Sequence, residues 1–111
     1  MNKGLPVINI EFDDAKVGKA DVLALSKAIQ KIVSEATKIE DVFVYANSSQ
    51  IKVEVAPIEI FVEMSASKVP DKEALFQVIK EPLVKWKKEN NFKHPITITL
   101  TPVDWKFEVD I

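Results

Sequence analysis

The chain has 111 residues, of which 47% are hydrophobic and 29% are charged, and its formal net charge is −2. This balance is typical of a globular protein and excludes a largely disordered chain. The length fits one core, so we expect a single domain over residues 1–111, with residues 1–5 as an N-terminal extension. A chain of charge −2 without a basic stripe is not expected to bind nucleic acid.

The residue types narrow the chemistry further. The chain has no cysteine, which excludes disulfides, thiolate catalysis and cysteine-bound zinc. Its single histidine, His94, falls in a predicted loop, and one histidine cannot build the usual metal site of several ligands. We therefore expect no metal and no cofactor. All fifteen basic residues are lysine, so any bound anion meets point charges rather than the planar fork of arginine.

No apolar run approaches the roughly 20 residues that a membrane-spanning helix needs. The first twenty residues also lack the apolar core of a signal peptide. We therefore expect no membrane association, and the expected location is the cytoplasm.

The first half of the chain predicts a strand, a helix and two further strands. Ile8, Ile10 and Phe12 alternate with polar residues, as in a half-buried strand. Asp21 is the predicted N-cap of a helix whose apolar residues recur every three or four positions as far as Ala36. The next predicted strands cover residues 42–46 and 51–55, with a turn of Asn47, Ser48 and Ser49 between them.

The second half repeats this order. Pro57 precedes a predicted strand over residues 58–64, and Pro70 with Asp71 suits the first turn of a second helix. Pro82 falls inside that helix and is expected to kink or end it. Residues 96–100 and the tail "WKFEVDI" (residues 105–111) both alternate as strands do.

Together these elements predict an α/β (α+β) fold. Right-handed crossovers make each βαβ unit a parallel strand pair with its helix on one face, so two units give a four-stranded mixed sheet with both helices on the same side, plus a C-terminal strand. Ile8, Ile10 and the alternate residues of the 58–64 strand should face the helices. The opposite face should carry Asn9, Glu11, Glu59 and Glu63. The ferredoxin-like fold has the same element order and is the alternative.

Glu59 and Glu63 share one face of a predicted strand and invite comparison with an acid/base pair. Four residues of strand separate them by about 13 Å, which exceeds the roughly 5 to 9.5 Å of paired catalytic carboxylates in glycosidases. They are therefore expected to be surface residues of the sheet.

Four segments carry a resemblance to a known family, namely "LPVINIEF", "LSKAIQKIVSEAT", "PIEIFVEM" and "DWKFEV". They resemble the tautomerase superfamily, which includes macrophage migration inhibitory factor, and are most similar to a bacterial branch of unknown function. The resemblance covers nearly the whole chain. It implies the tautomerase fold and a pocket for a small anionic or keto-acid ligand. We also expect a homotrimer, because the four alternating apolar residues of the tail over residues 105–111 exceed what a small two-layer domain covers and invite pairing with a neighbouring chain. Alternatively, Trp105 and Phe107 cover the core of their own chain.

The resemblance also nominates two site residues. It implies that Pro6 is the catalytic base, as a secondary amine whose pKa is lowered by an apolar pocket. It implies that Lys38, in the segment Ala36-Thr37-Lys38, helps to hold an anionic substrate. Lys38 alternatively stabilises the C-terminal end of the first helix. Arginine, which often holds the substrate carboxylate in active relatives, is absent here.

The position of Pro6 decides whether this chemistry is available. As an internal residue its nitrogen is an amide without a basic lone pair, and Pro6 is then explained as a residue that opens a strand. Leucine codons can serve as bacterial start codons, so initiation at position 5 would give a methionine that is readily removed before Pro6. Two hypotheses follow. The chain is a keto–enol tautomerase or small-anion binder, inactive as written, or it is a non-catalytic binding or assembly module with a vestigial pocket.

Overall fold

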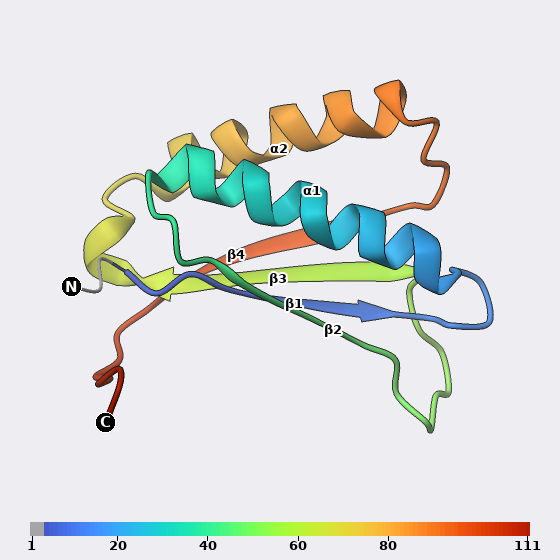
Figure 1. Cartoon of the computed structure of the whole chain (residues 1–111), viewed down its shortest axis with the longest axis horizontal. Coiled ribbons are helices and arrows are strands. Elements are labelled where there is room, and N and C mark those ends of the chain that lie inside the picture. Colours follow the sequence, from blue (N-terminus) through green and yellow to red (C-terminus); the bar gives the residue numbers. More distant parts are fainter. Residues whose placement is uncertain (1–3) are drawn as a thin grey trace.

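The computed structural model describes residues 4–111 as two layers, a four-stranded sheet with two helices on one of its faces (Figure 1). The elements in chain order are β1 (Val7–Phe12), α1 (Lys19–Thr37), β2 (Phe43–Asn47), β3 (Ile58–Ser65), the short 3-10 helix η1 (Ala66–Lys68), α2 (Lys72–Glu89) and β4 (Thr97–Val103). The strand order is β2-β1-β3-β4. β1 pairs with β2 and β3 with β4 in parallel, while β1 and β3 are antiparallel. The predicted pair of βαβ units in a mixed sheet is confirmed.

The register between β1 and β3 separates an apolar face from a polar one. Ile10 lies opposite Ile60, and both side chains are fully buried beneath the helices. From α1, Leu25 and Ile29 pack into this core without any exposed surface. The neighbouring residues Asn9, Glu11, Glu59 and Glu63 stay half-buried on the other face, as predicted.

The two helices begin differently. The carboxylate of Asp71 accepts the amide of Ala74 at 3.0 Å and caps α2. The prediction that Asp21 caps α1 is wrong, because the N-cap is Gly18 and Asp21 lies in the first turn. Val17, directly before Gly18, is buried in the core. The Val22 amide donates to the Gly18 carbonyl, so the first helical hydrogen bond forms at Gly18.

Pro82 does not end α2, which continues to Glu89. Proline removes one helical hydrogen bond and is usually unfavourable at an interior position. Here Ile79 on one side and Leu83 on the other are both buried against the sheet. Packing of the two flanking turns thus holds the helix together across the proline.

The predicted strand over residues 51–55 does not form, although its apolar residues alternate. β2 and β3 lie on opposite sides of β1, so residues 48–57 must cross the end of β1, where no neighbouring strand is available. Lys52 holds this crossing, since its ammonium lies 3.1 Å from Asp13 Oδ1 and 2.6 Å from Asp14 Oδ1. Ile51 and Val53 are left 88% and 100% exposed.

The predicted C-terminal strand over residues 105–111 is also absent. β4 is an edge of the sheet, and the chain leaves it after Val103 without a turn that would bring it back alongside. Instead, the Trp105 indole N–H donates to the Ser65 hydroxyl at 2.8 Å and ties the tail to the end of β3. Phe107 packs edge to face on Trp105, with ring centroids 5.9 Å apart.

The contact of Lys52 with two carboxylates predicts a pH-dependent contribution to stability. The Ala15 amide and then Lys52 lower the pKa of Asp13, and the hydrogen bond from Lys52 lowers the pKa of Asp14. A carboxylate with a lowered pKa stabilises the fold above its unfolded value, here 3.8, and loses that contribution as the pH falls through the folded value. Lys52→Met should therefore lower the free energy of unfolding at neutral pH, and the loss should shrink as the pH falls below 3.8 and through the lowered pKa values of the two carboxyl groups.

Urea unfolding at several pH values measures this difference. Lys31→Met, which removes an exposed lysine of α1, serves as the matched control and should show a much smaller loss. A loss for Lys52→Met that is the same at acidic and neutral pH would contradict the ion-pair explanation.

Candidate functional site

One end of the molecule gathers both site residues nominated from the sequence. Because β1 and β2 are parallel and β3 runs the other way, the starts of β1 and β2 meet the end of β3 there. The end of α1, η1 and the chain after β4 lie at the same end, on the left of Figure 1. Pro6, before β1, and Lys38, after α1, are brought to this end by the crossover.

Pro6 is fully buried and integrated into the sheet. Its carbonyl accepts the amide of Phe43 at 3.3 Å, and this bond extends the pairing of β1 with β2. Before it, the Gly4 carbonyl accepts the amide of Ser65 at 2.9 Å and extends the pairing of β1 with β3. With Leu5 bonded to its nitrogen, Pro6 opens the strand and has no basic lone pair.

The backbone conformation and the close packing at position 4 both favour glycine. Its φ of +147° is rarely adopted by residues with a side chain. A Cβ atom at this position would lie 2.9 Å from Cγ of Lys68 and 3.2 Å from Cδ1 of Ile39. Leu5 also has a positive φ, of 43°. Gly4 and Leu5 are therefore packed parts of the fold, whereas the remainder of the predicted extension, residues 1–3, lies outside the described residues.

A hollow of about 320 Å³ opens beside Gly4. Its polar lining residues include Lys68, Ser67 and Asp104. Trp105 and Phe107 supply aromatic surface, and the hydrogen bond of Trp105 to Ser65 fixes that wall. Lys68 offers a positive charge to a small carboxylate and the aromatic rings suit an apolar part, while the acidic Asp104 opposes an anion on its side of the hollow.

Lys38 lies outside this lining. It caps the C-terminal end of α1 in the left-handed conformation, with φ of 60°, and it is exposed. The adjacent Ile39 packs near Gly4, so Lys38 borders the region without lining the hollow. Sequence reasoning missed Lys68 and the role of Trp105. The small polar run Ser65-Ala66-Ser67 between a strand and Pro70 was the available signal for a turn there.

The carboxylates of the open sheet face form a second group. Glu11 lies directly opposite Glu59 on neighbouring strands, beside a hollow of about 130 Å³ that Lys52 also lines. Glu63 lies farther along β3, opposite Val7, so Glu59 and Glu63 make no pair. Within residues 4–111 no group of three or more histidine or acidic side chains is arranged to hold a metal ion. None of the helices in these residues has the length and hydrophobicity to cross a membrane.

No protein-family model and no curated protein matches the sequence. Solved structures do match the fold, and they include tautomerase and macrophage migration inhibitory factor proteins. Malonate semialdehyde decarboxylase is 13% identical with a TM-score of 0.67, and the match covers 95% of this chain and 92% of that protein. Its structures include a variant with the first residue, a proline, changed to alanine. The fold of this chain is therefore the tautomerase fold.

Two further matches support the same fold. A wild-type fused 4-OT, described as an asymmetric trimer, is 12% identical with a TM-score of 0.62 over 91% of each chain. A macrophage migration inhibitory factor-like protein from Entamoeba histolytica is 14% identical with a TM-score of 0.57 over 95% of each chain. At these identities the likeness establishes the fold alone.

The packing of Gly4 leads to a stability prediction. Gly4→Ala should lower the free energy of unfolding by about 1 kcal/mol or more, because the new Cβ meets Lys68 and the backbone is strained for alanine. Gly18→Ala is the matched control, since a Cβ there meets nothing within 4 Å and φ is −75°. Its cost should stay within about 0.5 kcal/mol, because a poorer N-cap is offset by a less flexible unfolded chain. Equal losses in urea unfolding would show that Gly4 is not tightly packed.

Proposed function

We propose that the hollow lined by Lys68 and Trp105 binds a small carboxylate such as a 2-keto acid, and that the protein acts as a keto–enol tautomerase in a chain that begins with Pro6 as a free N-terminal amine and so lacks Gly4 and Leu5. The observation that carries this proposal is the position of Pro6 at the head of β1, at the end of the fold where Lys68 and Lys38 supply positive charge. The matched structures include a malonate semialdehyde decarboxylase and a 5-carboxymethyl-2-hydroxymuconate delta-isomerase, which supports an activity of this kind.

The chemistry follows from the surroundings of Pro6. A secondary ammonium in a buried, apolar place has a lowered pKa, so a free amine there is unprotonated more readily at neutral pH. Such an amine can take a proton from the carbon next to a ketone and return it at the enol oxygen. Lysine ammonium groups hold the carboxylate of the substrate meanwhile. With Leu5 attached, the nitrogen of Pro6 is an amide and cannot act as a base. The hollow then binds the carboxylate without catalysing its tautomerisation.

The packing of Gly4 favours a second candidate, a non-catalytic binding or assembly module in which the pocket is vestigial. The residues that would have to be absent for Pro6 to act as a base are hydrogen-bonded to Ser65 and packed on Lys68. An extension that contributes to the fold in this way fits a chain that works with Pro6 capped.

We also propose a homotrimer. The open face of the sheet carries exposed aromatic residues, Phe43 at 46% and Tyr45 at 55%, with Val7 opposite Phe43. The tail adds exposed apolar residues at Phe107, Val109 and Ile111. Apolar surface gathered in this way favours association, and one matched protein is described as a trimer.

The remaining proposals concern the setting of this activity. We place residues 1–111 in one domain that works in the cytoplasm, without a cofactor and without nucleic-acid or membrane partners. The composition supports this, since the chain is slightly acidic and has no cysteine.

The catalytic proposal is tested with two chains, one beginning at Met1 and one in which a single methionine precedes Pro6 and is removed. Intact mass verifies each N-terminus, and circular dichroism verifies the fold. We expect phenylpyruvate tautomerisation, followed by enol absorbance, only in the chain that begins at Pro6. In that chain Pro6→Ala should lower kcat/KM by about 100-fold or more, whereas Lys68→Ala, which removes the lysine that lines the hollow, should mainly raise KM. Lys38→Ala, outside the lining, should raise KM less.

The outcomes separate the two candidates. Equal activity in both chains would show that the amine of Pro6 is not the base. A folded chain with a verified Pro6 terminus and no activity would reject the tautomerase and leave the assembly module.

The trimer is tested by light scattering at micromolar concentration, where we expect a mass about three times 12.5 kDa. Tyr45→Lys should lower this mass because it places a charge on the open sheet face. Leu23→Lys is the matched control, since Leu23 is 57% exposed on α1, and it should leave the mass unchanged. Deleting residues 105–111 should reduce assembly before it unfolds the monomer. A monomer of the unaltered chain at this concentration would rule out the trimer.

A further inference from the structure

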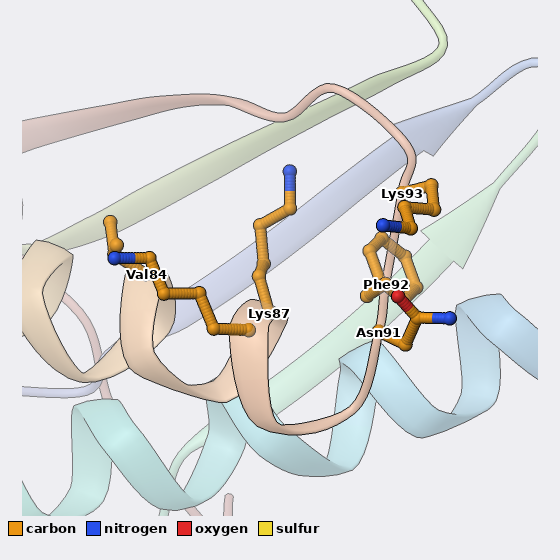
Figure 2. Close-up of a pocket in the computed structure, with 6 residues that line it drawn as sticks. Val84, Lys87, Asn91, Phe92 and Lys93 are labelled. Carbon is orange, nitrogen blue, oxygen red and sulfur yellow. The ribbon is translucent and has the colours of Figure 1, made fainter.

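A second hollow, of about 470 Å³, lies where α2 ends and the chain turns toward β4 (Figure 2). It is at the opposite end of the molecule from Pro6, because α2 runs away from η1. Figure 2 shows Lys87 pointing from the last turn of α2 toward the loop, which carries Phe92 and Lys93. The first turn of α1 borders this loop, since Asp21 Oδ2 lies 2.9 Å from His94 Nε2.

The hollow has a firm apolar floor. Phe92 is only 8% exposed, and its ring lies 5.1 Å from the ring of Trp86, centroid to centroid. The loop is held to the helix by two hydrogen bonds of Lys87, whose carbonyl accepts the Phe92 amide at 2.9 Å and whose ammonium donates to the His94 carbonyl at 2.7 Å. Val84, 42% exposed, adds an aliphatic wall.

The rim of the hollow is strongly basic compared with the rest of the protein. Residues 84–94 contain four lysines and one glutamate, a formal charge of +3, in a chain whose net charge is −2. The rest of the chain therefore has a formal net charge of −5. Glu89 is paired with Lys85, at 4.0 Å, and in residues 4–111 no carboxylate forms an ion pair with Lys87, Lys88 or Lys93.

We propose that this hollow is a binding site for a small amphipathic carboxylate, an acid with one aromatic or branched apolar group. The carboxylate pairs with a lysine of the rim, Lys88 or Lys93, and the apolar group rests on Phe92 and Val84. The volume is within the range of ligand pockets, about 300 to 1,000 Å³. The apolar floor favours a hydrocarbon part over a polyphosphate, and lysine suits a compact single anion.

NMR titration of the full chain from Met1, labelled with ¹⁵N, tests this site. The probe is 3-phenylpropionate, with the uncharged 3-phenylpropanol as its matched analogue. We expect the amide chemical shifts of residues 84–93 to change saturably with the acid. The amide signals of Gly4 and Lys68 should not shift. The alcohol should bind at least about tenfold more weakly, because it leaves the lysine charges without an anion.

Paired variants test the lysines. Lys88→Ala with Lys93→Ala should weaken binding of 3-phenylpropionate about tenfold or more, since both ammonium groups line the hollow. Lys72→Ala with Lys80→Ala makes the same charge change on α2 outside the lining and should leave the affinity within about twofold. Lys87 is kept because its ammonium holds the loop.

Several outcomes would overturn the proposal. These are no saturation up to about 10 mM acid, equal binding of the alcohol, or shifts centred on Gly4 and Lys68, which would assign the acid to the first hollow. Tighter binding of a hexaglutamate peptide than of the acid would identify a docking surface for acidic protein instead. The full chain has Pro6 capped, so these results are independent of whether a chain beginning at Pro6 is active.

Discussion

The antiparallel ladder between β1 and β3 joins the two βαβ units, and the positions of the other elements depend on its register. Ile10 opposite Ile60 directs both isoleucines under the helices. A shift by one residue would turn Glu11 and Glu59 into the core and expose the isoleucines to solvent, at a large cost in desolvated charge and lost apolar burial. The bond from Ser65 to Gly4 continues this ladder past Pro6. The proline at the head of β1 is thus positioned by the same pairing that builds the core.

This topology also gives the molecule two chemically different ends. Every strand and helix runs from one end to the other, so the connecting segments collect in two groups. One group includes Gly4, Lys68 and the aromatic tail, and the other includes Lys88, Lys93 and the loop held by Lys52. A small two-layer fold can therefore carry two ligand hollows without either one disturbing the core between them.

The elements predicted from sequence were those whose apolar residues pack against other parts of the same chain. The periodicity of α1 and of β3 reflects such packing, and both were found at nearly the expected bounds. Residues 51–55 and 105–111 alternate equally well, yet alternation does not show whether a neighbouring strand is available. For residues 51–55 the neighbour is excluded by the crossing over β1, a fact of strand order that no local pattern contains.

In the candidate site, too, local sequence patterns did not identify residues that the fold brings in from distant parts of the chain. Pro6 and Lys38 were nominated by the family resemblance, and the structure shows that they lie at the same end of the fold. Lys68 and Trp105 were missed because they reach the hollow through η1 and through a tail bent back by one hydrogen bond. Of the two outcomes expected for Pro82, a kink or an end of the helix, the end does not occur, since the buried Ile79 and Leu83 flank the proline and α2 continues past it.

The placement of the two tryptophans gives each hollow its own optical signal. Trp105 lines the hollow near Pro6 with its indole bound to a hydroxyl, whereas Trp86 packs on Phe92 beneath the other hollow. Neither ring is shared between the ends, and the chain contains no third tryptophan. Replacing one indole by phenylalanine therefore leaves a protein whose emission reports on a single end. Binding at either proposed site can therefore be assigned to its end of the molecule by tryptophan fluorescence, without any attached dye.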